Sequence, residues 1–222
     1  MRPEGPTPRT EVRRKPDRAD HTRDTIDAII DTAPICHVGF VYGGDPVVIP
    51  TIHARVGDTL YFHGSPASRM LRHLKTGAEV CVTVTVVDGL VLARSAFHSS
   101  MNYRSAMVFG TGRLVEDPDE KSAALRALVE HVIPGRWEEV RPITDKEMKG
   151  TLVVAVAIDD ASAKVRTGPP QDEEDDQALP IWAGVVPLET VAGAPIPDAA
   201  SRDVLPEPGS VVRYRAGGVT GS

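Results

Sequence analysis

Hydroxyl and cationic side chains gather in residues 61–71, where an apolar strand-like run passes into a helix-like run. Gly64, Ser65 and Ser68 form a turn of small residues with two hydroxyls, and Arg69 follows just inside the helix. Backbone N–H groups, hydroxyls and a cation at the start of a helix are the groups that bind phosphate. The stretch therefore predicts a site for a phosphate monoester, with an ordinary capped helix as the alternative.

Other nucleotide-binding and catalytic motifs are absent from the sequence. It contains no GxxxxGK[ST] loop, no GxGxxG and no GxSxG. The seven histidines show neither HxH nor HExxH spacing, and the two cysteines lack zinc spacing, so we expect no metal site. Ligation of a haem by one histidine remains open.

A second polar group occupies residues 95–105, between two apolar runs. Ser, His, Asn, Tyr and Arg side chains crowd this segment, as the polar rim of a ligand site would require. A long polar hairpin is the alternative. His98 is the side chain here that can transfer protons near neutral pH, which makes it the candidate catalytic residue.

Two further candidates lie in the last third of the chain. In an extended chain Lys164 and Arg166 point the same way and could reach an anion or the electron-rich edge of a ring. Trp182 could cover a planar ligand. The alternatives are an exposed basic loop and an aromatic side chain that only packs.

Composition limits the class of protein. The chain has 222 residues, 41% of them hydrophobic, and a net charge of -6, which argues against general nucleic-acid binding. No apolar run is long enough for a membrane helix, and the polar N-terminus lacks the apolar core of a signal peptide. We therefore expect a cytoplasmic protein that binds neither nucleic acid nor membranes.

The expected elements are mostly strands. Apolar and β-branched runs predict strands at 35–42, 46–54, 59–63, 79–87, 90–96, 105–116, 151–158 and 181–188, with a turn at Asp88-Gly89 and an irregular segment at 161–170. Helical spacing predicts helices at 21–33, 68–74 and 119–132, and a short one from Thr144. The pattern indicates a mainly β fold, an antiparallel barrel with peripheral helices, with an open α+β sheet as the alternative.

Three regions are expected along the chain. Residues 1–20 are rich in Pro and Arg and predict a flexible basic arm, and residues 21–190 hold the folded domain. Residues 191–222 predict a Pro- and Gly-rich C-terminal tail.

Several segments, in this order, resemble the pyridoxamine 5'-phosphate oxidase-like family of split-barrel flavin proteins. They are Cys36–Phe40, Pro46–Thr51, Leu60–Ser65, Ser95–Ser105 and Lys164–Pro170. Within the family the chain is most similar to the nitroimidazole-resistance-type flavin-nucleotide-binding branch, over residues 22–190. The vitamin B6 oxidases end in a segment with Arg and His that binds the substrate. The tail of this chain does not match that segment, so oxidation of vitamin B6 is not expected.

The resemblance implies a six-stranded antiparallel split β-barrel that forms a homodimer with one FMN in each interface cleft. The residues implied to bind the cofactor are Val48, Ile49, Pro50 and Thr51 at the ring and Ser65, Ser68, Arg69 and Lys75 at the phosphate, and His63 belongs to the same cofactor-binding set. Asn102, Tyr103 and Arg104 would reach it across the interface, and Lys164, Arg166 and Trp182 would lie near the ring.

The implied activity is an FMN-dependent oxidoreductase that passes electrons or hydride to a small organic acceptor, with a nitro compound as one candidate. Three alternatives stay open. The protein could be a flavin carrier or sensor without turnover, a haem-binding relative, or a reductase that uses the deazaflavin F420, whose acidic tail would suit the basic arm around Arg13 to Arg18.

Overall fold

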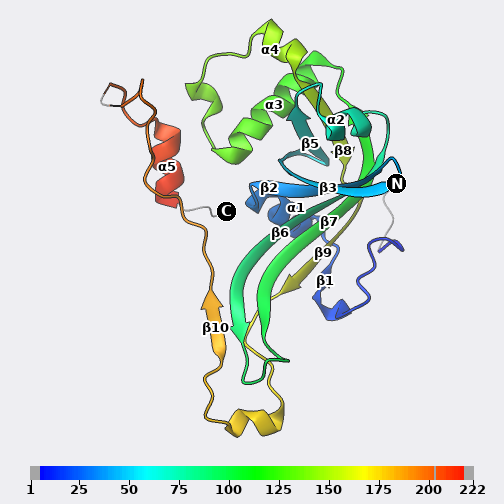
Figure 1. Ribbon diagram of the computed structural model, residues 1–222, viewed down its shortest axis with the longest axis vertical. Helices are drawn as coiled ribbons and strands as arrows, with labels where there is room; N and C mark the ends of the chain where they lie inside the picture. The colour runs from blue at the N-terminus through cyan, green and yellow to red at the C-terminus, as the bar shows by residue number, and fades with distance from the viewer. Residues whose placement is uncertain (1–5, 203, 218–222) are drawn as a thin grey trace.

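Antiparallel strands form one connected network in this computed structural model, which describes residues 6–202 and 204–217 (Figure 1). The main path runs β3-β2-β6-β7-β8-β5-β4, and β9 joins β7, β1 joins β9, and β10 joins β6. The strands are β1 (Ala19–Asp20), β2 (Ile35–Tyr42), β3 (Asp45–Ile52), β4 (Ala54–Val56), β5 (Thr59–Gly64), β6 (Glu79–Leu92), β7 (Ser100–Leu114), β8 (Leu152–Ala157), β9 (Asp160–Arg166) and β10 (Gly184–Pro187). The expected mainly β, antiparallel architecture with peripheral helices is confirmed, and the described residues form ten strands.

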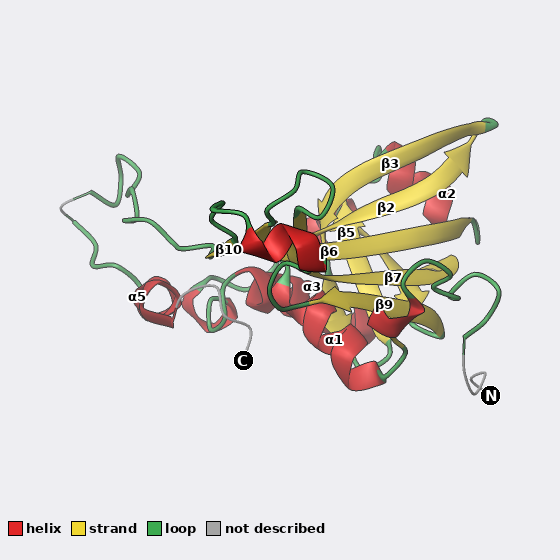
Figure 2. Cartoon of the chain, turned by 90° about the horizontal axis from the view of Figure 1, so that it is seen from below, coloured by secondary structure: helices red, strands yellow, loops and turns green. Residues whose placement is uncertain are grey.

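Helices lie around the edges of the strands. They are α1 (Arg23–Thr32), α2 (Arg69–Leu74), α3 (Pro118–Val132), α4 (Asp145–Gly150) and α5 (Gly209–Gly217), with short 3-10 turns at Pro16–Arg18, Trp137–Glu139 and Glu174–Ala178. Seen from below, α1 lies near β9 and β7, whereas β2, β3 and α2 lie together at the other edge (Figure 2). The first four helices were expected from the sequence, and each begins within two residues of its predicted start.

The strand that starts at Glu79 does not turn back at Asp88 and Gly89. It continues to Leu92 through a bulge, so the prediction of two strands with a turn between them is wrong. Gly89 stays in the strand because β10 passes close beside it, and a Cβ there would come within 3.0 Å of the Val186 carbonyl oxygen. The reversal falls in residues 93–99, and β7 returns from Ser100.

The segment 161–170 was expected to be irregular, but its residues up to Arg166 belong to strand β9. This strand pairs with β7 from Phe109–Asp160 to Tyr103–Arg166. Pairing with a long neighbouring strand overrides the weak strand propensity of a segment rich in Ala, Ser and charged residues. The consequence is that Lys164 and Arg166 are held by a ladder of backbone hydrogen bonds.

Strand β5 divides its side chains between two apolar cores. Leu60 and Phe62 point into the barrel, where they meet the three buried isoleucines of α1. Tyr61 points the other way and packs with Leu125 and Leu128 of α3. Because side chains alternate along a strand, His63 follows Tyr61 on the α3 side.

Helix α2 is seated on the far end of β7. A Cβ on Gly112 would lie 2.3 Å from the Leu74 carbonyl oxygen, so only glycine allows the end of α2 to approach the strand this closely. Met70, Leu71 and Leu74 anchor the helix in the barrel core. The turn at 64–68 is therefore held in a fixed position.

Both chain ends that the structure describes are tied to the body. In the segment expected to be a flexible arm, residues 6–20 contact β9: the Thr7 hydroxyl donates to Asp160 at 2.6 Å, and Ala19 pairs with Lys164. In the predicted tail, helix α5 is held where the Ser210 amide donates to Glu139 at 2.8 Å. Residues 1–5 and 218–222 of these two predicted regions lie outside the described residues. No helix in the described part of the chain is long and apolar enough to cross a membrane.

Candidate functional site

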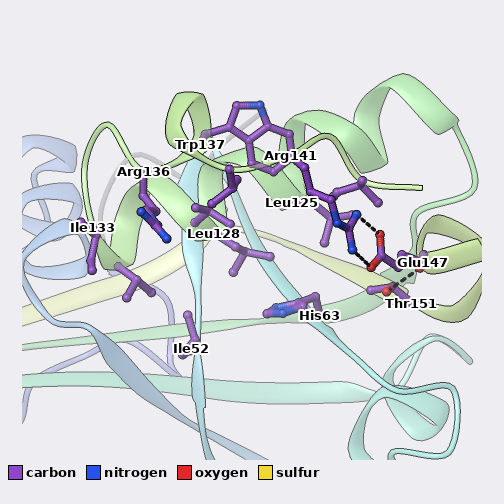
Figure 3. A pocket seen from close by; sticks show the side chains of 14 residues that line it. Ile52, His63, Leu125, Leu128, Ile133, Arg136, Trp137, Arg141, Glu147 and Thr151 are labelled. Carbon is purple, nitrogen blue, oxygen red and sulfur yellow. Dashed lines mark hydrogen bonds and ion pairs between the residues drawn. The ribbon is translucent and has the colours of Figure 1, made fainter. Parts of the chain in front are cut away.

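A cavity of about 610 Å³ opens between α3 and β5 (Figure 3). Its lining is predominantly apolar: Ile52, Leu125, Leu128, Val129, Val132, Ile133, Trp137, Val140 and Ile143 form most of its surface. The apolar side chains of α3 that face it continue the core around Tyr61. An apolar cavity of this size is large enough for an organic cofactor.

His63 supplies the single imidazole in the lining of this cavity. In Figure 3 its ring lies beside Ile52, below Leu125 and Leu128 of α3. Within the described residues, neither of its ring nitrogens has a hydrogen-bond partner. The His63 side chain is exposed at the open side of the cavity, yet desolvation by the apolar groups around it lowers the pKa of His63 below its ordinary value, so the ring is neutral near pH 7.

Two arginines mark the edge of the cavity, and they differ in their partners. Glu147 neutralises Arg141, since its carboxylate accepts a hydrogen bond from Arg141 Nη1 at 2.9 Å. Arg136 approaches Glu139 at 3.4 Å, but that carboxylate already accepts the amide and hydroxyl of Ser210. Arg136 is therefore the cation at this edge that is more available to an anion.

The turn expected to bind phosphate keeps its hydroxyls close to backbone amides. Ser65 Oγ accepts from the Ala67 amide at 3.1 Å, and Ser68 Oγ caps α2 by accepting from Leu71 at 3.4 Å. The Arg69 guanidinium lies over the Tyr42 ring, 5.7 Å from its centroid. Among the described residues, Arg69, Arg72 and Lys75 have no acidic partner, and all three are exposed, so the turn and helix form a basic surface.

Strand β3 presents the predicted ring-lining residues to solvent. Val47 and Ile49 pack on the barrel core, while Val48, 64% exposed, and Pro50 face outward. Thr51 is half-buried and pairs with Cys36 of β2. Ile52, the next residue, lines the same cavity as His63.

Asn102, Tyr103 and Arg166 form a second group at the start of β7. Arg166 donates to Asn102 Oδ1, and Asn102 Nδ2 donates to the Gly168 carbonyl at 3.1 Å. Tyr103 is the register partner of Arg166. The structure thus brings these three predicted residues together, whereas Arg104 is held in a bidentate ion pair with Asp88 at 2.9 and 3.0 Å.

The remaining predicted residues lie around the same end of β7. Lys164 Nζ donates to the Arg14 carbonyl at 2.9 Å. His98, in the 93–99 reversal, has its Nε2 3.4 Å from a carboxylate oxygen of Glu173. Trp182 is 66% exposed and its indole lies against Gly184.

The two predicted groups lie at opposite ends of one strand. Asn102 is near the first residue of β7, and α2 packs at Gly112 near the last. Ten residues of strand span about 33 Å. Two groups are thus distinguished: the β3–α2 group (Val48–Thr51 of β3 with Ser65, Ser68, Arg69 and Lys75) and the Asn102–Arg166 group (Asn102, Tyr103 and Arg166). Within one chain, the phosphate-type turn of the first group lies far from the second group.

The α3 wall of the cavity, with Trp137, Arg136 and Arg141, was not predicted from the sequence. The apolar positions of residues 119–132 have helical spacing, and such spacing looks the same for a helix that packs on a sheet and for one that also lines a cavity. A signal was present in the cluster of Trp, Ile and Val with two arginines at 136–143, although it has no fixed spacing.

Comparison with known proteins places these features in a family. The family model described as pyridoxamine 5'-phosphate oxidase matches residues 22–165. No curated protein matches the chain. Among solved structures, the flavocytochrome Anf3 from Azotobacter vinelandii is 42% identical, with a TM-score of 0.88, over 96% of this chain and 99% of that one.

Two other solved structures show which branch of the family this chain is more similar to. The FAD and haem binding protein from Mycobacterium smegmatis is 43% identical, with a TM-score of 0.86, over 89% of this chain and 97% of that one. A candidate 5-nitroimidazole antibiotic resistance protein from Bacteroides thetaiotaomicron is 28% identical, with a TM-score of 0.55, over 66% of this chain and 86% of that one. The expected likeness to the nitroimidazole branch is thus weaker than the likeness to the two preceding proteins. The chain has the split-barrel fold and belongs to the pyridoxamine 5'-phosphate oxidase family.

Proposed function

We propose that this chain is a redox protein that holds a haem as well as a flavin. The observation that carries the proposal is the apolar cavity between α3 and β5, with the unpartnered imidazole of His63 in its wall. The similarity to a flavocytochrome and to an FAD and haem binding protein, each above 40% identity, supports it. The haem, open as one alternative from the sequence, becomes part of the main proposal.

The residues around the cavity fit a haem. A neutral imidazole is a common axial ligand of haem iron, and His63 is kept neutral by its apolar surroundings. The α3 wall with Leu125 and Leu128 offers an apolar surface for a macrocycle. Arg136 supplies a cation at the edge, where the carboxylates of a haem would need one.

The exposed β3 strand and the α2 turn fit a flavin phosphate. Ser65, Ser68 and Arg69 offer hydroxyls, amides and a cation, and Arg72 and Lys75 add positive charge on the following turns. We expected FMN from the sequence, but the similarity to an FAD and haem binding protein makes FAD the first flavin to test. Bound flavin and haem would supply two-electron and one-electron transfer, respectively.

The chain's own residues would prepare these sites in three ways. The side chains of α3 exclude water from one face of the cavity, and His63 presents a neutral nitrogen from a rigid strand. The cations of α2 fix a phosphate against the barrel. The separation of the two predicted groups along β7 supports a homodimer in which each flavin contacts the β3–α2 group of one copy and the Asn102–Arg166 group of the other.

We further propose that the bound flavin reduces a small organic substrate. Transfer to a small organic acceptor such as a nitro compound should appear as steady-state oxidation of NADH or NADPH. A carrier or sensor would bind flavin without this turnover. An F420-dependent reductase would prefer F420 to FAD and FMN in parallel binding titrations.

The haem proposal is tested by titrating the purified chain with hemin and recording the Soret band. His63→Ala should weaken binding and shift the band, and added imidazole should restore the ligated spectrum. His21→Ala, which removes a histidine just before α1, is the matched control and should behave as wild type. An unchanged spectrum in His63→Ala would exclude His63 as the ligand, and no Soret band in the wild type would refute haem binding.

A further inference from the structure

A second, smaller cavity lies where the N-terminal segment meets β9. It has a volume of about 210 Å³ and is lined by Asp17, Arg18, Val165, Arg166, Thr167 and Gln171. The pairing of Ala19 with Lys164 fixes Arg18 beside this end of β9. Unlike the α3 cavity, its surface is almost entirely polar, so it suits a charged ligand and not an apolar one.

Arg166 is the buried charge in this cavity. It is only 7% exposed, yet its described partners are neutral: the amide oxygen of Asn102 and, at 3.4 Å, the Pro169 carbonyl. A buried guanidinium without a carboxylate is costly unless an anion compensates it. These two contacts use part of its five N–H donors, and the rest remain for the cavity.

Positive charge is concentrated around Arg166. Desolvation is the main cause that lowers the pKa of the Arg166 guanidinium, and the positive charge of the nearby Arg18 lowers it further. Within the described residues, Arg18, Arg14 and Lys15 have no ion-pair partner. Asp17 is the one carboxylate in the lining, and it forms no ion pair with a described cation.

We propose that Arg18 and Arg166 bind a phosphate group in this cavity, with a diphosphate as the best match to two converging guanidiniums. Planar guanidiniums bind phosphate oxygens through paired hydrogen bonds, and a diphosphate offers two such groups. The phosphate could belong to a dinucleotide cofactor or to a separate phosphorylated compound. The site shares no residue with the α3 cavity, so it does not depend on the haem proposal; it shares Arg166 with the proposed flavin site, so the dinucleotide source rests on that proposal.

The test is calorimetric titration of the purified protein with inorganic pyrophosphate at low ionic strength. Arg18→Gln and Arg166→Gln should each weaken binding about tenfold or more, because a charge-assisted hydrogen bond is lost. Arg13→Gln removes the same charge from the same segment, but Arg13 is paired with Glu11 at the surface, so its affinity should match the wild type. Arg18→Gln removes no described side-chain hydrogen bond, and it decides the question if Arg166→Gln does not fold.

Parallel titrations with FAD, FMN and inorganic phosphate identify the source of the phosphate. If Arg18→Gln weakens the binding of FAD and pyrophosphate but not of FMN, the diphosphate of the dinucleotide is the ligand. If Arg18→Gln weakens the binding of pyrophosphate but of neither flavin, a separate phosphorylated compound is the ligand. If pyrophosphate does not bind the wild type, or if all three variants lose affinity equally, the proposal is overturned. Hemin binding, read from the Soret band, is measured separately and does not affect this outcome.

Discussion

At the scale of single residues, His63 shows how position on a strand decides a role. The resemblance to split-barrel flavin proteins included it among the expected flavin-binding residues. Alternation along β5 instead points its ring toward α3, into the apolar cavity. A short shift along the chain, from His63 to Ser65, thus separates a proposed haem ligand from a proposed phosphate ligand.

His53 is a second histidine with a structural consequence, and it makes stability depend on pH. It is fully buried, its Nε2 lies 2.9 Å from the Ile30 carbonyl, and its Nδ1 has no partner. Desolvation is the main cause that lowers the pKa of His53 from 6.5 to about 4, and the nearby His131 adds to it. Between about pH 6.5 and pH 4, His53 is therefore protonated in the unfolded chain but stays neutral in the folded chain.

The expected result is a loss of stability as the pH falls from about 6.5 toward 4. A shift of this size corresponds to about 3 kcal/mol of unfolding free energy, fully lost only below the folded pKa. The measurement is urea unfolding at several pH values for the wild type and His53→Gln. The difference between the two curves should shrink or reverse on acidification, and parallel curves would contradict this role of His53.

At the scale of elements, the sequence predicted most helices and strands but not where strands end. The β-branched run from Glu79 and the capped helices had strong local signals. The continuation of β6 through Asp88-Gly89 did not, because a turn-forming pair in a strand is tolerated only when a neighbour such as β10 covers it. Strand β9 was not predicted for the same reason, because its extended conformation is stabilised by pairing with β7 and not by its own residues.

The contact of α2 with β7 yields a prediction for this element. Gly112→Ala should destabilise the fold by about 1–3 kcal/mol, since its Cβ would overlap the backbone of Leu74. It should also weaken flavin binding, because Ser68 and Arg69 belong to the helix that must move. Thermal unfolding and a flavin titration measure the two effects.

Gly150→Ala serves as the control for this substitution. A Cβ at Gly150 meets no atom within 4 Å, so this variant should unfold near the wild-type temperature and keep its flavin affinity. Equal behaviour of the two variants would show that α2 is not held by the glycine at position 112.

At the scale of the whole molecule, the candidate flavin residues occupy two ends of the barrel. The sequence could indicate both groups but not their separation, because distance along β7 depends on the length of the strand pair β6–β7 (Figure 1). The α3 cavity was likewise hidden, as its walls come from residues 52–63 and 125–151, which are distant in the chain. Tertiary packing alone brings these segments together.

The proposed homodimer predicts complementation between two defective chains. Arg69→Ala and Asn102→Ala alter opposite groups, so each homodimer should bind flavin weakly at both sites. A mixed dimer from co-expression should contain one intact site and bind about half the wild-type amount of flavin, because both changes fall in the other site. Differently tagged chains and a flavin assay measure this, and mixed dimers no better than either parent would contradict a shared site.

The most direct measurement of the central claim is the absorption spectrum of the purified chain after incubation with hemin and FAD and removal of the excess. We predict a Soret band together with flavin bands, with one haem and one flavin per chain by quantitation. His63→Ala should change the Soret band alone, and Arg69→Ala should diminish the flavin bands alone. A chain that retains neither cofactor, or whose bands ignore both substitutions, would contradict the account.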